Sequence, residues 1–324
     1  MSERQTRIVF LDAATFGDVA LQSFAEMWDC TVHQVTAPAE TAQRLAGATI
    51  AVTNKVAIDK NIFAAPEARD LKLIAVAATG TDIIDKQTAA ERGVKVCNVP
   101  GYASQSVAQF TLALILELAS RASSYAAAVK TGEWERSAVF TLLTFPNIEL
   151  SGKKLGIIGY GNIGKTVAKM AAGFGMEVLV GARPGGSTPP AGRIPLEELF
   201  RQADFISLHC PLTPDTQSLI NQRTLALMKP SAFLVNTARG ALIDELALID
   251  ALHTKRIAGA ALDVITREPP PADHPVIVAA KELDNLLVTP HTAWSALEAR
   301  KRLLVIVQEN IAAFLHGQPK NLVG

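Results

Sequence analysis

The sequence predicts an α/β fold of two domains, each a doubly wound parallel sheet of the Rossmann or flavodoxin type. Short aliphatic or β-branched runs alternate with helical patterns along the whole chain, which is typical of parallel sheets covered by helices on both faces. A glycine-rich motif follows the sixth of these runs, at the point where a nucleotide-binding half begins. The chain has 324 residues, of which 49% are hydrophobic and 19% charged, and this is enough for two cores.

The predicted strands form two sets along the chain. The first set comprises Ile8–Leu11, Thr31–Val35, Thr49–Val52, Leu73–Ala77 and Val94–Cys97. The second set comprises Lys154–Ile158, Glu177–Val180, Phe205–Leu208, Phe233–Asn236, Gly259–Leu262 and Leu286–Thr289. Residues 104–121 are apolar nearly all round, so we expect a helix that is buried either in the chain's own core or at a dimer interface.

The glycine-rich motif is G-x-G-x-x-G at Gly159, Gly161 and Gly164, between a predicted strand and a predicted helix. Gly159 permits the tight turn, Gly161 lets a pyrophosphate approach the backbone, and Gly164 lets the helix pack against the strand. The free N–H groups at the start of the helix, around Asn162 and Ile163, favour phosphates. The motif therefore predicts a dinucleotide cofactor at these residues.

Two connections are predicted to be hinges between the domains. Asn98–Gly101 follows the first set of strands and Thr289–His291 follows the second, and the last predicted helix, Trp294–His316, lies beyond both. We therefore expect a discontinuous substrate domain of residues 1–101 and 292–324, and a dinucleotide-binding domain of residues 102–291. Ligands of such folds bind beyond the C-terminal ends of the strands, so we expect a cleft between the domains.

Composition argues against several classes of protein. The net charge is zero and the pI is about 7.0, which gives no electrostatic reason to expect a nucleic-acid or membrane partner. Cys30, Cys97 and Cys210 are far apart, so neither a metal site nor a disulfide framework is expected. The N-terminus lacks a signal-peptide core and the longest apolar stretch is too short to span a bilayer. We expect a cytoplasmic protein, and a homodimer.

Several further motifs occur in a fixed order. They are Ala78–Asp82, Asn98–Tyr102, the glycine motif, Leu208–Pro214, Val235–Gly240, Ala261–Val264 with Glu268–Pro269, and Thr289–His291. With these motifs the chain resembles the D-isomer-specific 2-hydroxyacid dehydrogenase family over nearly its full length. Three segments are similar to the glycerate dehydrogenase and hydroxypyruvate (glyoxylate) reductase branch: Thr53–Lys55, Ser106–Gln109 and Phe145–Pro146.

The resemblance implies hydride transfer between a nicotinamide cofactor and a small 2-keto acid. It assigns Arg239 to the substrate carboxylate and carbonyl, and a guanidinium can grip a carboxylate with two parallel hydrogen bonds. It assigns His291 to proton transfer, for which a group that titrates near neutrality is suited. It pairs Glu268 with that histidine, and an ionised neighbour favours the imidazolium.

Other residues gain a role from their place in the matching segments. Asp263 is expected near the nicotinamide, the alternative being a residue that only satisfies turn amides. Thr79 and Gly80 follow a strand of the first domain, where backbone N–H groups can hold the substrate carboxylate. Lys55 can add positive charge for an acidic substrate, the alternative being a solvated lysine. The remaining cofactor residues predicted in this way are Pro211, Thr216, Thr237 and Ala238.

The turn after the second strand of the cofactor domain predicts which dinucleotide is preferred. An acidic residue there usually binds the adenosine ribose in NAD-preferring enzymes, but no Asp or Glu occurs between Glu177 and Glu197. Arg183 stands near the position of the missing acid and can pair with a 2′-phosphate, assisted by Ser187, Thr188 and Arg193. We therefore predict a preference for NADP(H), with NAD(H) possible.

Two rival interpretations stay open at this point. The chain can be another dehydrogenase of the family, such as a short phosphoglycerate dehydrogenase; a formate dehydrogenase is disfavoured because those enzymes pair the histidine with glutamine. The chain can also be a dinucleotide-sensing protein without turnover, since fold alone does not exclude it.

Overall fold

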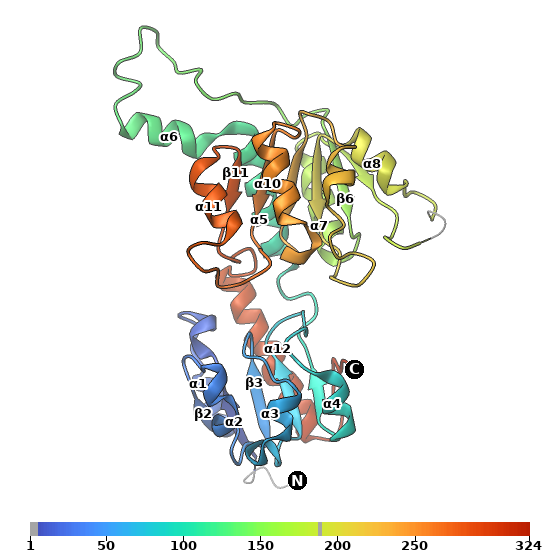
Figure 1. The fold of residues 1–324 in the computed structure, drawn as a ribbon. Coiled ribbons are helices and arrows are strands. Elements are labelled where there is room, and N and C mark those ends of the chain that lie inside the picture. The colour runs from blue at the N-terminus through green and yellow to red at the C-terminus, as the bar shows by residue number, and fades with distance from the viewer. Residues whose placement is uncertain (1–5, 187–189) are drawn as a thin grey trace. The chain divides into compact units, whose positions relative to one another are not determined.

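The structure is a computed structural model that describes residues 6–186 and 190–324, and its chain forms two compact units (Figure 1). Unit 1 comprises residues 1–103 and 295–324, and unit 2 comprises residues 104–294. These boundaries lie two and three residues beyond the expected 101 and 291. Tyr102 stays with unit 1 because its carbonyl accepts a hydrogen bond from Arg302, and Thr292 and Ala293 stay with unit 2 because their amides donate to Asp263.

Unit 1 is a five-stranded parallel sheet of the flavodoxin type, with the order β2-β1-β3-β4-β5. Its strands are β1 (Arg7–Phe10), β2 (Asp29–Val32), β3 (Ile50–Thr53), β4 (Leu73–Val76) and β5 (Lys95–Cys97). Its α-helices are α1 (Gln22–Met27), α2 (Thr41–Arg44), α3 (Lys60–Ala64), α4 (Lys86–Glu91) and α12 (Leu297–Leu315). Short 3-10 helices cover Ala13–Phe16, Pro38–Glu40 and Pro66–Ala68.

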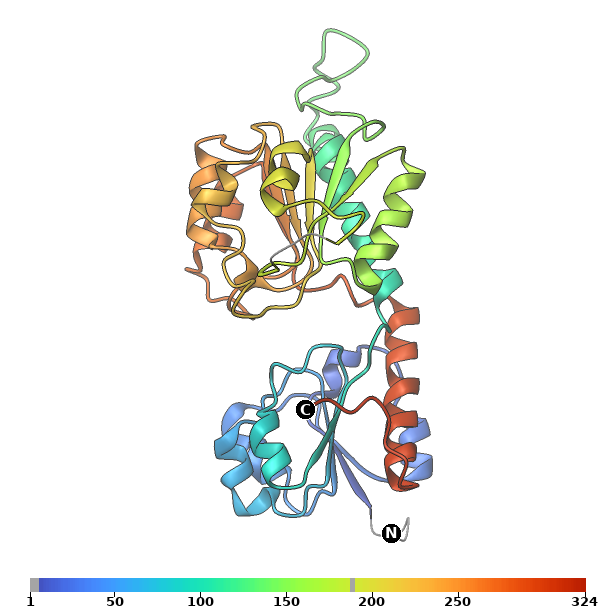
Figure 2. The same cartoon turned by 90° about the vertical axis from the view of Figure 1, so that its right-hand side faces the viewer.

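Both faces of this sheet are covered. Figure 2 shows α12, in red, on one face and the light-blue and cyan helices α3 and α4 on the other. The residues alternate accordingly: Val9 and Ile74 pack with Phe63 of α3, while Phe10 packs edge-on against Phe24 of α1. The period of two is what a strand buried on both faces requires.

The predicted strand Thr31–Val35 is displaced in the structure, where β2 covers Asp29–Val32. The cause is the parallel ladder, which pairs Arg7 with Asp29 and Phe10 with Val32 and ends where β1 ends. The predicted strand includes Val35 because its side chain is β-branched, but Val35 is 70% exposed and lies outside β2. The other ten predicted strands are confirmed to within a residue or two at their ends.

Unit 2 is a six-stranded parallel sheet with the order β11-β10-β9-β8-β6-β7. Its strands are β6 (Lys154–Ile158), β7 (Glu177–Val180), β8 (Phe205–Leu208), β9 (Phe233–Asn236), β10 (Gly259–Leu262) and β11 (Leu286–Val288). Its α-helices are α5 (Ser104–Ser120), α6 (Ala122–Lys130), α7 (Asn162–Gly173), α8 (Leu196–Gln202), α9 (Gln222–Leu225), α10 (Glu245–His253) and α11 (Pro275–Glu282), with a 3-10 turn at Gly240–Leu242.

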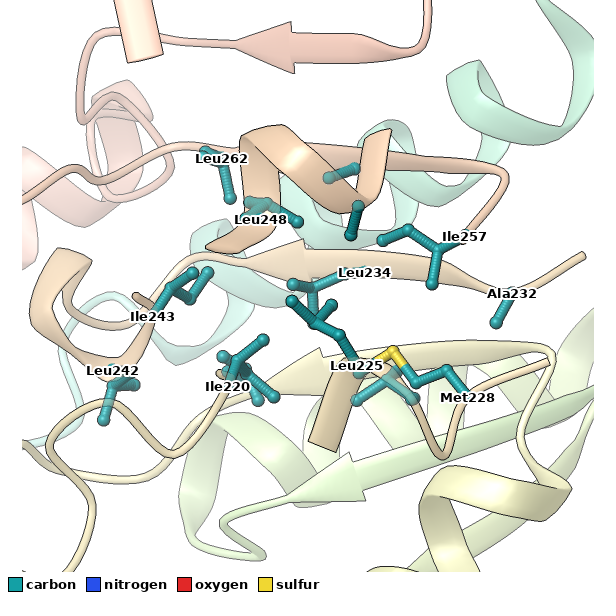
Figure 3. Packing of buried hydrophobic residues seen from close by; sticks show 14 of the residues in the cluster. Ile220, Leu225, Met228, Ala232, Leu234, Leu242, Ile243, Leu248, Ile257 and Leu262 are labelled. Carbon is teal, nitrogen blue, oxygen red and sulfur yellow. The ribbon is translucent and has the colours of Figure 1, made fainter. Parts of the chain in front are cut away.

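Two hydrophobic clusters enclose this sheet. On one face Leu234 and Leu262 pack with Leu248 of α10 and Leu225 of α9 (Figure 3). On the other face, residues of α5 and α7 pack against Leu155, Ile157 and Val235. The helix predicted at 104–121 is therefore buried within the chain's own core, and it ends at Ser120 because Arg121 adopts a left-handed conformation with φ of 55°.

The order of the strands fixes where a ligand binds. The chain moves from β6 to β7 on one side and then crosses to β8 on the other, so the direction of winding reverses at β6. In open α/β sheets ligands bind beyond the carboxyl ends of the strands at such a point. The glycine motif follows β6 directly.

No single described helix is both long and apolar enough to cross a membrane. Only the pair α5 and α6 passes that test together, and the two helices are bent by 61° at Arg121.

Candidate functional site

The glycine motif forms a tight turn between β6 and α7. Gly159 has φ of 99°, and a Cβ there would lie 2.4 Å from the carbonyl carbon of His209. A Cβ at Gly164 would lie 2.2 Å from the Gly159 carbonyl oxygen. A Cβ at Gly161, by contrast, would meet nothing within 4 Å, and no side chain caps the N-terminus of α7. The space beside Gly161 is thus open and the first amides of α7 have no side-chain cap, so these residues fit the pyrophosphate of a dinucleotide.

The loop after β8 borders this turn. His209 donates its backbone N–H to Ile158 and its Nε2 lies 2.9 Å from the hydroxyl of Ser207. Burial lowers the pKa of His209 to about 4, and its Nδ1 is buried without a hydrogen-bond partner among the described residues. Thr216 and Pro211 are both predicted to bind cofactor. The hydroxyl of Thr216 donates a hydrogen bond to the carbonyl of Pro211, which stabilises the loop after β8. Their contact with cofactor stays a prediction.

Asn236 shapes the loop that carries Arg239. Its buried side chain accepts a hydrogen bond from the amide of Ala238 and donates one to the carbonyl of Arg239, at 3.0 and 2.8 Å. The hydroxyls of Thr237 and Thr111 lie 3.0 Å apart, which ties the loop to α5. Arg239 is half-buried, and its Nη1 donates to the Ala238 carbonyl. The backbone direction at Arg239 is therefore fixed from both ends by Asn236.

The loops after β9 and β10 touch through their backbones. A Cβ at Gly240 would lie 2.0 Å from the carbonyl carbon of Ile265, so only glycine allows this contact. The amide of Ile265 donates to Oε1 of Glu268 at 3.0 Å. Thr266 donates to the carboxylate of Glu245 through both its amide and its hydroxyl. These bonds hold the loop that presents Glu268.

His291 and Glu268 form a close pair. Nδ1 of His291 lies 2.5 Å from Oε2 of Glu268, and the two side chains are 24% and 31% exposed. The pair is thus open enough to exchange protons with a ligand yet short enough for a charge-assisted hydrogen bond. Because Glu268 occupies Nδ1, Nε2 is the nitrogen left for a reacting oxygen.

Asp263 holds the loop that carries His291. Its Oδ1 accepts from the hydroxyl of Thr289 and the amide of Thr292, and its Oδ2 accepts from the amide of Ala293. Its own carbonyl accepts from the amide of His291, which has φ of 52°. Asp263 is 1% exposed, and burial raises the pKa of its carboxyl group while these hydrogen bonds lower it. It serves turn amides, the alternative considered above, and its contact with the nicotinamide stays a prediction.

In unit 1 a buried carboxylate also holds a loop by accepting hydrogen bonds from backbone amides. Asp12, which follows β1, accepts hydrogen bonds from the amides of Asn54, Lys55 and Val56, the turn that follows β3. Burial raises the pKa of Asp12, and the backbone hydrogen bonds oppose that rise. Lys55 is exposed at this turn.

The other predicted substrate residues of unit 1 lie in the turn after β4. Thr79 donates its hydroxyl to the carbonyl of Val99, and its carbonyl accepts from the side chain of Asn98. Thr79 is exposed and Gly80 is half-buried. Their backbone thus lies at the C-terminal edge of the sheet of unit 1, and their binding role stays a prediction.

The turn after β7 differs from its prediction in one respect. Arg183 is exposed, as expected for a residue that meets a phosphate, and it makes no ion pair within the described residues. However, a Cβ at Gly185 would lie 2.8 Å from Oδ2 of Asp215, so a carboxylate from the loop after β8 stands beside this turn. Ser187 and Thr188 lie outside the described residues, whereas Arg193 is half-buried.

Sequence reasoning missed the residues that act through others. Asp12 and Asp215 contact loops that are distant in the sequence, and no spacing in the chain signals such contacts, whereas Asn236 contacts residues two and three positions further on. Asn236 stands within a motif already noted, so its position between a strand and Arg239 was the one available sign. Within residues 6–186 and 190–324, no group of His, Cys, Asp and Glu side chains has the arrangement of a metal site.

Comparison with known proteins identifies the family. The model of the NAD-binding domain of D-isomer-specific 2-hydroxyacid dehydrogenases matches residues 112–293. The glycerate dehydrogenase of Methylorubrum extorquens is 41% identical over 98% of both chains. The hydroxypyruvate reductase of Blautia hydrogenotrophica is 36% identical over 98% of this chain and 99% of its own.

A solved structure agrees with these relatives. An acyclic imino acid reductase in complex with NADPH and D-Arg superposes with a TM-score of 0.83, at 30% identity over 98% of this chain and 100% of its own. The chain belongs to the D-isomer-specific 2-hydroxyacid dehydrogenase family of NAD(P)-dependent oxidoreductases that act on a CH–OH group.

Proposed function

We propose that this enzyme reduces a small 2-keto acid of the hydroxypyruvate and glyoxylate class to the 2-hydroxy acid. The observation that carries the proposal is the 2.5 Å contact between His291 and Glu268. It lies in the same unit as the glycine turn and Arg239, and all three follow strands whose carboxyl ends share one edge. The relatives named glycerate dehydrogenase and hydroxypyruvate reductase support this substrate class.

The proposed chemistry divides a hydride and a proton between cofactor and protein. When bound, a dihydronicotinamide would supply the hydride that C2 of the keto acid accepts. His291 donates the proton from Nε2 to the C2 oxygen, and Glu268, at Nδ1, stabilises the imidazolium before transfer. Arg239 binds the carboxylate and polarises the carbonyl. Thr79, Gly80 and Lys55 remain the predicted carboxylate residues of unit 1.

For the cofactor we propose Gly159, Gly161 and the first amides of α7, Asn162 to Gly164, as the pyrophosphate site. Pro211, Thr216, Thr237, Ala238 and Asp263 remain the further predicted contacts. We propose NADPH over NADH because Arg183 is exposed and unpaired within the described residues, and because no acid follows β7. Asp215 opposes this preference, because its carboxylate borders the same turn and repels a 2′-phosphate.

The test of the function is a four-way comparison of initial rates: hydroxypyruvate and glyoxylate, each with NADPH and with NADH. Faster turnover with NADPH supports the enzyme and the role of Arg183 together. Equal or faster rates with NADH keep the enzyme and reject the cofactor preference. No turnover in any combination, with cofactor still bound, rejects this substrate class and favours either another 2-keto acid or the dinucleotide-sensing alternative.

Two variants of opposite sign test the cofactor preference. Ala182→Asp restores an acid after β7 and should shift the ratio of kcat/KM values toward NADH by about tenfold. Asp215→Asn removes the nearby carboxylate and should shift it toward NADPH. If neither substitution changes the ratio, the 2′-phosphate is recognised elsewhere.

We also propose that the protein is a homodimer in which the loop after α6 contacts a second copy. This loop extends away from the sheet of unit 2 (Figure 1), and Phe140 and Leu143 are 90% and 83% exposed. Two apolar side chains that are this exposed on one segment favour an interface. Light scattering on the wild type and on Phe140→Ser tests it: a monomeric wild type rejects the proposal. The cytoplasmic location stays a prediction from the sequence.

A further inference from the structure

A cavity of about 480 Å³ adjoins the His291–Glu268 pair on the side of α11. It lies between the loop that follows β10, the helix α11 and the end of β11. Its walls are mainly aliphatic, with Ile265, Ile277 and Ala280 among them. Lys281, in the last turn of α11, and the pair itself supply polar groups. We call this cavity the α11 pocket.

The α11 pocket shares Asp263, Glu268 and His291 with the proposed active site but extends away from the other residues proposed for substrate and cofactor. Its lining falls in residues 263–270, 277–281 and 288–291. Among these described lining residues there is none from the glycine turn, the loop after β8 or the loop that carries Arg239.

The size and walls of the α11 pocket suit a small amphipathic molecule. Sites for such ligands measure about 300–1,000 Å³ and are lined mostly by apolar side chains with a few polar groups. Lys281 is exposed and forms no ion pair with any described residue. Asp263 and Glu268 also line the pocket, so a bound anion is attracted to the Lys281 end and repelled from the end near the pair.

We propose that the α11 pocket binds an aliphatic monocarboxylic acid, with its hydrocarbon chain against Ile265, Ile277 and Ala280 and its carboxylate on Lys281. Because Glu268 and His291 form part of the wall, the bound chain restrains the pair and inhibits proton transfer. The binding step stands on the pocket alone; the inhibition rests on the proposed function.

Binding is tested first, without turnover. Isothermal titration of the full-length, cofactor-free protein with butanoate, hexanoate and octanoate should show affinity rising about two- to fourfold for each added methylene. Octanol, which lacks the charge, should bind about tenfold more weakly than octanoate. Absence of binding, or binding without any dependence on chain length, overturns the proposal.

Matched variants on one helix locate the site. Ala280→Phe fills the pocket and Lys281→Gln removes its cation, and each should weaken octanoate at least about tenfold. Val278→Phe is the control, because Val278 lies on the same helix with 41% of its surface exposed and is not among the pocket's lining residues. Thermal unfolding confirms that each variant folds. Equal weakening by all three variants, or by none, places octanoate elsewhere and overturns the site.

Inhibition is measured separately, with the keto acid varied at fixed octanoate. Occupancy of the α11 pocket should lower kcat, and Ala280→Phe should remove the effect while leaving the uninhibited rate within about twofold. Purely competitive inhibition that survives Ala280→Phe shows instead that octanoate occupies the substrate site, and it overturns the inhibitory role. If octanoate binds but no keto acid is turned over, the proposed function is rejected and the proposed binding site in the α11 pocket still stands.

Discussion

His209 and His291 follow two strands of the same sheet, β8 and β11, yet the structure gives them opposite surroundings. The ring of His209 lies 2.9 Å from a serine hydroxyl and burial lowers its pKa to about 4, so it is neutral at working pH. His291 lies 2.5 Å from a carboxylate and is partly exposed. Two histidines at the ends of strands in one sheet thus differ in partner and in exposure, so position in the fold alone does not suit a histidine to the proton transfer proposed for His291.

The substitution predicted to lower turnover most distinguishes His291 from His209. His291→Gln should lower kcat about 10²- to 10⁴-fold, because it removes the proposed proton donor, with the Kd for cofactor nearly unchanged. The matched substitution His209→Gln should lower kcat by less than about tenfold, because its ring has no proposed contact with the reacting oxygen. Steady-state rates and cofactor titration measure both. Comparable losses in the two variants would remove the distinction drawn above.

The next effect tests the partner. Glu268→Gln keeps a hydrogen-bond acceptor for His291 but removes the charge that favours the imidazolium, so kcat for reduction should fall about ten- to hundredfold near neutrality. Steady-state rates of both proteins near neutral pH check it. An unchanged kcat would mean that the charge of Glu268 is not needed for proton transfer.

A smaller effect concerns Asn236 as a positioning residue for Arg239. Asn236→Asp keeps the acceptor for Ala238 but loses the donor to the Arg239 carbonyl, so kcat/KM should fall about tenfold, chiefly through KM. Arg239→Lys loses the two-pronged grip on the carboxylate and should cost about ten- to hundredfold. If Asn236 acts through Arg239, the double variant should be little worse than Arg239→Lys alone. Fully additive losses would contradict that coupling.

The smallest effect is on stability and concerns His209. Its pKa in the folded protein, about 4, lies below the usual 6.5, so between these values the unfolded chain takes up a proton that the folded protein does not. Stability should therefore fall as the pH falls from about 6.5 toward 4, by about 1–3 kcal/mol from this group. Urea unfolding at several pH values should show a shallower fall in His209→Gln. An identical slope in both proteins would show that the ring is not buried as the structure has it.

Much of the fold was predictable because local patterns and tertiary demands coincide. The strand Lys154–Ile158 is aliphatic, is followed by glycines that a tight turn requires, and was located to the residue. Phe205–Leu208 and Gly259–Leu262 are buried on both faces and were located equally well. At the edge of the sheet of unit 1 the agreement fails, because β2 is held by one neighbour whose end sets its register.

The residues of the candidate site also divide into those that motifs identified and those whose contacts only the structure shows. Arg239, Glu268 and His291 were identified through motifs, and the structure brings Glu268 and His291 into contact across 23 positions of sequence. Asp263 is expected beside the cofactor, which stays a prediction; the structure shows that its carboxylate accepts hydrogen bonds from Thr289, Thr292 and Ala293. A carboxylate's neighbours depend on which loops meet it, and the sequence pattern does not contain that information.

By itself the sequence determined the alternation of strands and helices, the glycine turn and the residue types at the ends of the strands. These follow from hydrophobic periodicity and from backbone conformations that only certain residues adopt. The resemblance pairs Glu268 with His291, and the tertiary structure supplies the contact itself, at 2.5 Å, and the position of Asp215 beside the turn after β7. These contacts join loops that are distant in the sequence, so they form only when the helices and loops of unit 2 have packed.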